Sequence, residues 1–257
     1  MRVHVKGAGG FIGRHLTPAL ERAGHELQPA VAGADVVVHL AGIAHRKASA
    51  DELQEANVRL PERLARQAPR FVFMSSVKVH GERSTAPFTE RSPIRPEDAY
   101  GESKARAEDA LRAIAGLKLV VLRPPLVYGP RVKANFLSLM RAISRGWPLP
   151  LASIENRRNL IYVGNLLDAI VRSLDVEGTY LVSDGEAVST PQLCRDIAEA
   201  LGTRARLMPF PPALLPAKLA ASLEVDDAAF RRTGWRAPFS REQGLRATAE
   251  WLQAPER

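Results

Sequence analysis

The chain has 257 residues, of which 46% are hydrophobic and 25% charged, and its formal net charge is +8. This composition is typical of a globular protein and excludes disorder, collagen-like repeats and coiled coil. No apolar run reaches about 18 residues, so no membrane-spanning segment is expected. The start, MRVHVKGAGG, lacks a long apolar stretch, and Cys194 is the single cysteine. We therefore expect no signal peptide, no disulfide and a cytoplasmic location.

The positive charge comes mainly from arginines that are scattered singly along the chain. No basic run interleaved with aromatic residues is present, which argues against a nucleic-acid partner. A field of this sign also attracts small phosphorylated molecules. We expect such a small-molecule partner, with no nucleic acid and no membrane.

The first half of the chain alternates between strand-like and helix-like patterns. Strands are expected at 3–5, 35–40, 70–75 and 117–122, and helices at 12–23, 51–68 and 103–115. This alternation indicates βαβ units and an α/β fold of the Rossmann type, a doubly wound parallel sheet that is covered on both faces.

The second half has a different pattern, with helices expected at 135–145 and 166–174 and at both ends of 226–252. Segment 158–163 is short, and 179–182 is a candidate last strand. We expect a dinucleotide-binding domain from 1–130 plus about 155–183. A smaller substrate-binding domain is expected from 131–154 plus about 184–257, closing over the carboxyl edge of the sheet, where open α/β folds bind ligands.

Gly7, Gly10 and Gly13 lie between the first expected strand and helix. Glycines there let the backbone turn tightly and approach a pyrophosphate at the helix amino terminus. A glycine triplet is also common in ordinary turns, but its place after the first strand favours a dinucleotide site. The GxxGxxG spacing is characteristic of short-chain dehydrogenase/reductases.

The interval that follows the glycine loop is short. Only 21 residues separate Gly13 from Asp35, which is room for one helix and a strand stub at 26–28. The usual second helix and third strand do not fit. We expect a sheet that is shortened on the adenine side, and the choice between NAD and NADP stays open.

Tyr100 and Lys104 are spaced to share one face of a helix. A nearby ammonium favours the phenolate of a tyrosine, and ordered hydroxyls can relay its proton. Ser75 and Ser76 end an expected strand, where a hydroxyl can face a substrate oxygen. The YxxxK pattern alone is common at helix starts. Combined with the glycine loop and the serines, it predicts acid–base chemistry.

Seven motifs carry a resemblance to a known family. They are GAGGFIG at 7–13, HLAG at 39–42, EANV at 55–58, FVFMSSVKVHGE at 71–82, YGESK at 100–104, LRPPLVYGP at 122–130 and RRNLIYVGNLLDAI at 157–170. Over essentially its whole length the chain resembles the extended short-chain dehydrogenase/reductases of the NAD(P)-dependent nucleotide-sugar epimerase/dehydratase group. It is most similar to bacterial proteins of surface-polysaccharide synthesis, which include UDP-glucose 4-epimerase-like enzymes and 4-reductases of UDP-4-keto-6-deoxy-N-acetylhexosamines.

The resemblance implies a role for each matching residue. Tyr100 is the acid–base group, Lys104 its modulator and a ligand of the nicotinamide ribose, and Ser76 the catalytic hydroxyl. The residues implied to bind NAD or NADP are Gly7, Gly10, Phe11, Ile12, Gly13, Leu40, Ala41, Gly42, Asn57, Tyr100, Lys104 and Pro124. The residues implied to bind a nucleotide-diphosphate sugar are Ser76, Lys78, His80, Tyr100, Asn135 and Arg158. No metal site is expected, because no histidine has ligand spacing.

Some positions depart from the family pattern. Lys78 and His80 stand where 4-epimerases usually carry Thr and Tyr, and Leu126 stands where they often have Asn. No arginine near 210–225 matches the second phosphate ligand of many members. These differences weaken a strict UDP-glucose 4-epimerase assignment more than the family assignment.

Three functions therefore remain open. The leading hypothesis is C4 keto reduction of a UDP-4-keto-6-deoxy sugar, and the second is 4-epimerisation of a UDP-hexose. The third is a non-catalytic protein that binds or senses NAD(P), favoured by the short adenine side and disfavoured by the intact Ser76, Tyr100 and Lys104. A homodimer through 51–68 and 103–115 is a further implication of the resemblance.

Overall fold

The computed structural model describes residues 1–44 and 48–254. A six-stranded parallel sheet has the order β2-β1-β3-β4-β5-β8. Its strands are β1 (Arg2–Lys6), β2 (Glu26–Leu27), β3 (Val36–His39), β4 (Arg70–Met74), β5 (Lys118–Arg123) and β8 (Gly178–Leu181). A separate parallel pair joins β6 (Leu126–Tyr128) to β7 (Leu160–Tyr162). The expected Rossmann-type fold is confirmed.

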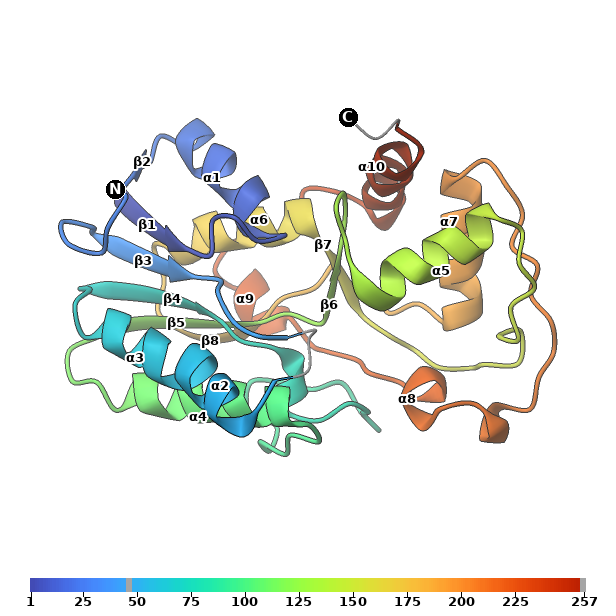
Figure 1. Cartoon of the computed structure of the whole chain (residues 1–257), viewed down its shortest axis with the longest axis horizontal. Coiled ribbons are helices and arrows are strands. Elements are labelled where there is room, and N and C mark those ends of the chain that lie inside the picture. The colour runs from blue at the N-terminus through green and yellow to red at the C-terminus, as the bar shows by residue number, and fades with distance from the viewer. Residues whose placement is uncertain (45–47, 255–257) are drawn as a thin grey trace.

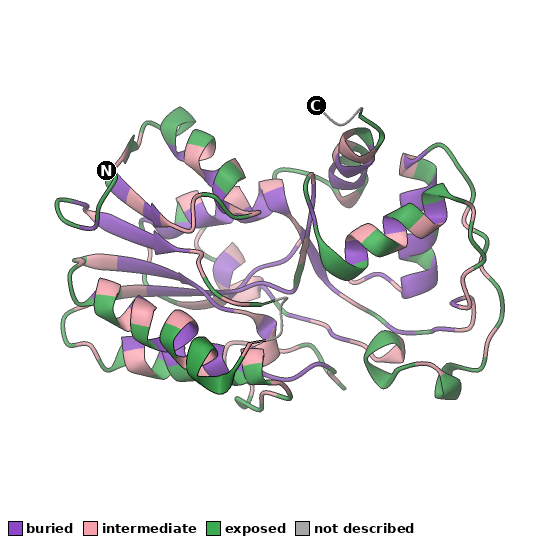
Figure 2. Cartoon of the chain, viewed as in Figure 1, coloured by how far each residue is buried: buried purple, intermediate pink, exposed green. Residues whose placement is uncertain are grey.

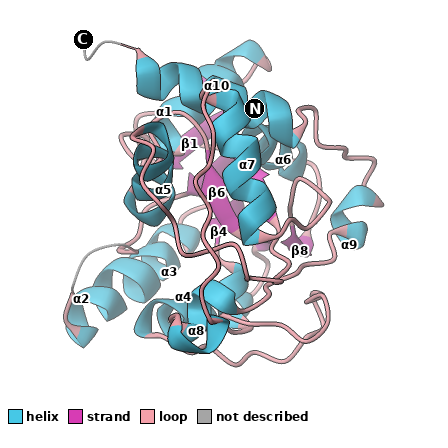
Figure 3. Ribbon diagram, turned by 90° about the vertical axis from the view of Figure 1, so that its right-hand side faces the viewer, coloured by secondary structure: helices cyan, strands magenta, loops and turns pink. Residues whose placement is uncertain are grey.

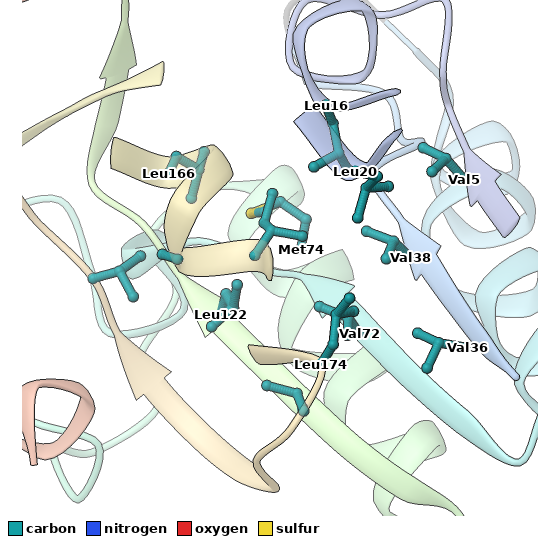
Figure 4. Close-up of a cluster of buried hydrophobic side chains, with 14 of the residues drawn as sticks. Val5, Leu16, Leu20, Val36, Val38, Val72, Met74, Leu122, Leu166 and Leu174 are labelled. Atoms are coloured by element: carbon teal, nitrogen blue, oxygen red, sulfur yellow. The ribbon is translucent and has the colours of Figure 1, made fainter. Parts of the chain in front are cut away.

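Helices cover both faces of the sheet, as Figure 1 shows. One face carries α1 (Gly13–Arg22) and α6 (Val163–Ser173), and the other carries α2 (Ala50–Gln54), α3 (Leu60–Ala65) and α4 (Ala99–Arg112). The central strands are buried on both sides, so they are continuous apolar runs. On the first face, Leu16 and Leu20 pack with Val38, Val72 and the residues drawn in Figure 4. The sequence predicted this core from the apolar strands and the helix stripes.

The sheet is short at the β2 edge, as expected from the Gly13–Asp35 interval. Only Arg2↔Glu26 and Val3↔Leu27 pair there, and residues 28–35 form turns that lead directly into β3. The Asp35 carboxylate accepts a hydrogen bond from the Arg2 backbone amide (2.7 Å) and closes this edge. The second helix and third strand of a complete first half are absent among the described residues.

The region 51–68 was expected to be a single helix, but it is divided into three helical segments. The chain forms α2, then the π-helical turn η1 (Glu55–Arg59), then α3. Pro61 lies in the first turn of α3, where its missing amide hydrogen is tolerated. The expected helix at 103–115 starts earlier, since Asp98 caps α4 by accepting from the Gly101 amide (2.7 Å). This earlier start places Tyr100 within the first turn of α4.

A second lobe lies beside the carboxyl ends of the strands, in front of the sheet in Figure 3. Its helices are α5 (Ala134–Ser144), α7 (Thr190–Ala200) and α10 (Arg241–Gln253), and its short turns are η3 (Pro212–Leu214) and α8 (Ala217–Ala220). These helices have a core of their own, which includes Phe136, Met140 and Ile197. The short helix α9 (Ala228–Arg231) instead packs beside β8. The exact domain boundaries stay a prediction, and 255–257 lie outside the described residues.

Within the described parts of the chain, no helix combines the length and apolar character needed to cross a bilayer.

Candidate active site

The glycine loop forms a tight backbone cradle between β1 and α1. Gly7 has φ +99°, and a Cβ built on it would lie 2.8 Å from the Ala41 nitrogen. A Cβ on Gly13 would lie 2.1 Å from the Gly7 oxygen, and the Gly10 amide donates to that same oxygen (3.0 Å). Side chains are therefore excluded from this cradle. It fits the close approach of a pyrophosphate to the start of α1.

Phe11 and Ile12, also expected to bind cofactor, are half-buried at the start of α1. Phe11 packs edge-on against His15 with the ring centroids 6.0 Å apart, and Ile12 packs against the sheet core. Pro124 is buried after β5, and its carbonyl accepts from the Val77 amide (3.0 Å). The cradle and Pro124 thus lie on two different strand ends of the same sheet.

The loop after β3 is held by one buried side chain. The Leu40 and Ala41 amides both donate to the Lys6 carbonyl, which aligns this loop beside the glycine cradle. Asn57 accepts from the Ile43 amide (2.8 Å) and donates to the Ile43 carbonyl (3.1 Å). A Cβ on Gly42 would lie 3.0 Å from the Asn57 oxygen and 3.4 Å from the Lys104 Nζ. The structure therefore brings Gly42, Asn57 and Lys104 together.

Tyr100 and Lys104 project from the first two turns of α4. The Lys104 Nζ lies 5.9 Å from the centroid of the Tyr100 ring and 4.6 Å from that of Phe73. It donates to the Met74 carbonyl (2.8 Å), at the end of β4. Ser103, which donates to the Tyr100 carbonyl (2.8 Å), accepts from Asn57 (2.8 Å). The π-helical turn and the Tyr–Lys helix are thereby tied to each other.

Burial shifts the pKa values of Tyr100 and Lys104 in opposite directions. It raises the pKa of Tyr100 to about 12, with a further contribution from the Asp98 carboxylate. Burial lowers the pKa of Lys104 to about 8, and the Glu108 carboxylate partly opposes this shift. The sequence predicted that Lys104 would favour the phenolate, whereas burial and Asp98 shift the Tyr100 pKa the other way. Without ligands, Tyr100 is therefore a neutral phenol at neutral pH.

The two serines at the end of β4 have different partners. Ser75 is buried and donates to the Glu108 carboxylate (2.5 Å). Ser76 is half-buried and accepts from the Lys78 amide (3.2 Å), so its own hydroxyl hydrogen can still be donated. Ser76 starts the turn η2 (Val77–Val79), which packs against the start of α4: a Cβ on Gly101 would lie 2.7 Å from the Lys78 carbonyl. Ser76 is therefore the serine that can serve a ligand beside Tyr100.

His80 has a structural position in place of the expected substrate contact. It is buried, with Nδ1 3.1 Å from the Pro93 carbonyl and Nε2 3.0 Å from Arg123 Nη1. The guanidinium can only donate, so Nε2 accepts and Nδ1–H donates to Pro93. Both ring nitrogens are occupied by the protein, which leaves neither for a substrate.

Lys78 lies at the edge of the site, half-exposed. Its Nζ donates to Asp98 (2.7 Å) and Glu82 (2.9 Å). These hydrogen bonds to carboxylates raise the pKa of Lys78 against the opposing effect of its partial burial. The Lys78 ammonium is therefore shared between two protein carboxylates, and it also holds the helix cap Asp98 in place.

The two expected diphosphate ligands belong to the second lobe and the chain that leads to it. Arg158 Nη1 donates to the carbonyls of Lys218 (2.8 Å), within α8, and of Ala221 (2.9 Å), directly after α8. Burial lowers the pKa of Arg158, and the Glu82 carboxylate partly opposes this. Asn135 is exposed in the first turn of α5. Glu82, which also pairs with Lys218, connects Arg158 to the Lys78 side of the site.

Sequence reasoning missed a buried network beneath Tyr100 and Lys104. Glu108, one turn after Lys104, accepts from Arg123 Nε (2.9 Å) and pairs with Arg112 (2.6 Å). Its contacts with Arg123 and Ser75 tie α4 to the ends of β4 and β5. The helical spacing of Glu108 from Lys104 and the place of Arg123 at a strand end were the available signals. Asp98 was also missed, although a capping residue before a helix start is recognisable.

The fold and this site define a class of protein. A parallel sheet with a glycine cradle between its first strand and first helix is the arrangement of dinucleotide-binding α/β proteins. Tyr100 and Lys104 lie on one helix, whose start packs against the turn that follows Ser76. The family model described as "NAD dependent epimerase/dehydratase family" matches residues 26–180. The chain belongs to this family.

Individual relatives point to two related reactions. The chain is 39% identical, over 86% of its length and 78% of the relative, to a UDP-glucose 4-epimerase of Vibrio cholerae. It is 25% identical, over 79% of its length and 60% of the relative, to a UDP-2-acetamido-2,6-beta-L-arabino-hexul-4-ose reductase of Pseudomonas aeruginosa. The structure of Thermus thermophilus UDP-glucose 4-epimerase with NAD superposes with a TM-score of 0.81 and 25% identity, over 99% of this chain and 100% of that one.

Proposed function

We propose that this protein is an NAD(P)-dependent oxidoreductase that reduces the C4 carbonyl of a UDP-4-keto-6-deoxy sugar. A bound NADH or NADPH supplies the hydride. Tyr100 gives its phenolic proton to the O4 atom, and the Ser76 hydroxyl donates a hydrogen bond to the same oxygen as charge develops on it. The Lys104 ammonium stabilises the tyrosinate that remains, which is then reprotonated from solvent.

The observation that carries this proposal is the placement of Tyr100 in the first turn of a helix that Asp98 caps, four residues before Lys104. A reductase needs a proton donor at this position at the start of its reaction, and a tyrosine phenol is protonated at neutral pH. Lys104, four residues on and close to Tyr100, supplies the opposite charge once the proton has left.

The cofactor side supports the same direction of reaction. Gly7, Gly10 and Gly13 form the cradle for the pyrophosphate, and Gly42 lies beside Lys104, where a nicotinamide ribose would be held. The two-residue strand β2 leaves fewer protein groups around the adenine end. A reductase must exchange its cofactor at every turnover, and a looser site favours that exchange.

The second candidate is a 4-epimerase of a UDP-hexose, favoured by the 39% identity to the Vibrio cholerae protein named UDP-glucose 4-epimerase. The same three residues would remove and then return a proton around a transient 4-keto sugar, with no net redox change. This reaction needs Tyr100 to begin as a base, so its pKa would have to fall when ligands bind. Retention of the cofactor between turnovers would be an advantage here.

The test measures both reactions with one preparation of the protein. We expect little NAD in the purified protein and consumption of added NADH or NADPH, followed by nicotinamide absorbance, with a UDP-4-keto-6-deoxy sugar. Interconversion of UDP-glucose and UDP-galactose is assayed in parallel without added cofactor. Tyr100→Phe should lower the rate by about 10²- to 10⁴-fold, because only the proton donor is lost, while NAD(P)H binding measured by fluorescence remains.

Each alternative outcome has a distinct meaning. Fast interconversion by protein that is purified with stoichiometric NAD would assign the epimerase. Binding of NAD(P)H without turnover of either nucleotide sugar would assign the third possibility, a binding or sensing protein. Full activity of the Tyr100→Phe variant would refute the acid–base role of Tyr100 in either reaction.

A further inference from the structure

Two segments of the second lobe carry positive charge with no negative charge among them. Residues 131–154 and 200–223 contain no aspartate or glutamate. Their basic residues are Arg131, Lys133, Arg141, Arg145, Arg204, Arg206 and Lys218. In a chain with 28 acidic residues, two acid-free stretches of this length concentrate a large share of the net charge of +8 in one lobe.

The two segments lie side by side in the fold. The Leu149 amide donates to the Arg206 carbonyl, and the Met208 amide donates to the Leu149 carbonyl, each at 2.8 Å. Arg206 Nη1 also donates to the Gly146 carbonyl (3.2 Å). Residues 146–149 therefore lie against 206–208, and 209–214 follow directly in the chain; we call 145–149 and 204–214 together the acid-free surface. It lies along the outer edge of the second lobe (Figure 2).

Large apolar side chains on this surface are exposed. Trp147 is 56% exposed, Met208 46% and Leu214 72%. The Arg145 guanidinium lies over the Trp147 ring, 5.6 Å from its centroid. Pro209, Pro211 and Pro212 lie between Met208 and Leu214 in the chain and limit the backbone freedom of the segment. Apolar groups exposed together on one surface are typical of a surface that binds a partner.

We propose that the acid-free surface docks the protein on an anionic lipid bilayer. Tryptophan is the residue that most favours the headgroup region of a membrane, where its ring is partly apolar and partly wet. Arginines around it attract anionic lipids, and the lack of acidic residues removes repulsion from the same charge. Leu214 and Met208 then insert shallowly among the acyl chains.

The position of this surface relates it to the candidate site. Downstream of Leu214, the chain enters α8, where Lys218 pairs with Glu82 and its carbonyl accepts from Arg158. Docking of the acid-free surface would thus hold the Arg158 side of the site near the headgroups. This revises the expectation from the sequence that there is no membrane partner, and it is independent of which sugar reaction the protein performs.

The experiment is cosedimentation of the whole chain with vesicles of phosphatidylcholine, with or without phosphatidylglycerol. We expect binding to the anionic vesicles only, and weaker binding as salt is raised. The double variant Arg145→Glu/Arg204→Glu should bind the anionic vesicles at least about tenfold more weakly than the wild type. The double variant Trp147→Ser/Leu214→Ser should lose a similar share of its vesicle affinity, because its apolar side chains no longer insert among the lipids. The matched control, Arg22→Glu/Lys118→Glu, makes the same change of charge at exposed sites of the first lobe and should bind like the wild type.

Three results would overturn the proposal. The first is no binding of the wild type to anionic vesicles. The second is equal loss in the Arg22→Glu/Lys118→Glu control, which would mean attraction by net charge alone. The third is a wild-type dimer in analytical ultracentrifugation that Trp147→Ser/Leu214→Ser converts to a monomer, which would make this surface an interface between two copies. Circular dichroism of each variant checks that it is folded, and the sugar assay is scored separately, so a failed function proposal leaves this result interpretable.

Discussion

Tyr100 and Lys104 lie in the same helix, and their surroundings shift their pKa values in opposite directions. Lys104 is buried and Tyr100 partly buried, and burial raises the pKa of the phenol and lowers that of the ammonium, because it disfavours whichever form is charged. Asp98 adds to the effect on Tyr100 because it must stay close, as the cap of α4. At neutral pH Tyr100 is therefore uncharged, while Lys104 with its pKa of about 8 is still mostly protonated.

The lowered pKa of Lys104 makes the free energy of unfolding depend on pH. Its pKa is about 8 in the folded protein against 10.5 for an ordinary lysine, so between these values the unfolded chain binds more protons. The free energy of unfolding contributed by this group therefore rises with pH in that window, by about 1.4 kcal/mol per pH unit. Lys104→Met removes the effect. Urea denaturation at several pH values between about 7 and 9.5 measures it as a difference between wild type and variant.

The control for this measurement is Lys118→Met, at an exposed position at the start of β5. The difference in free energy of unfolding between Lys118→Met and the wild type should stay constant over the same pH range. A constant difference for Lys104→Met as well would contradict the inferred burial of a charged Lys104.

The sequence predicted Ser76, Tyr100 and Lys104 as catalytic residues from their types and spacing, and that role stays a prediction. The sequence could not show that both ring nitrogens of His80 have protein partners, because those partners, Arg123 and Pro93, come from elsewhere in the chain. It also could not foresee that Arg158 would donate to the α8 carbonyls. Such contacts are set by the packing of distant segments, which local patterns do not record.

At the scale of elements, the strands were predictable because buried parallel strands are apolar along their whole length. The shortened β2 edge was predictable from chain length alone, since 21 residues cannot hold two helices and two strands. The π-helical turn η1 was not predictable, because it adds one residue to a turn without changing the helical pattern around it. That turn carries Asn57, fully buried, to the loop after β3.

Replacing Asn57 by Ala tests the role of that turn. The change removes hydrogen bonds to the Ile43 amide and carbonyl and to Ser103, and it leaves their buried partners unsatisfied. We expect a loss of about 2–3 kcal/mol in the free energy of unfolding and a higher KM for NAD(P)H, because the loop beside Gly42 is no longer fixed. Thermal or urea denaturation and steady-state kinetics measure the two effects.

Arg59→Ala is the matched control, since Arg59 is exposed on the same turn and only pairs weakly with Glu55 at 3.8 Å. It should change stability by less than about 0.5 kcal/mol and leave KM unchanged. Lost stability in Asn57→Ala with an unaltered cofactor KM would show that Asn57 only supports the fold.

At the scale of the whole molecule, the two lobes meet across charged side chains as well as through the β6–β7 pair. Arg158 donates to one carbonyl within α8 and one directly after it, while Glu82, buried beside η2, pairs with Lys78 and Lys218. A guanidinium has five N–H donors, and the two bonds to carbonyls use only the Nη1 hydrogens. Arg158 can therefore hold the second lobe in place and still grip a diphosphate with its other nitrogens.

This double role predicts a specific result for Arg158→Ala. Loss of a charge-assisted contact of about 1.5–3 kcal/mol corresponds to a rise of roughly ten- to a hundredfold in KM for the nucleotide sugar. The kcat should change little, because Arg158 does not take part in the proton transfer. Arg157→Ala is the neighbouring control: its side chain is exposed and pairs with Glu224, so its KM should match the wild type. Steady-state kinetics separates the two constants. A fall in kcat at unchanged KM, or an equal effect of Arg157→Ala, would mean that Arg158 acts through the placement of the lobe and not by contact with the substrate.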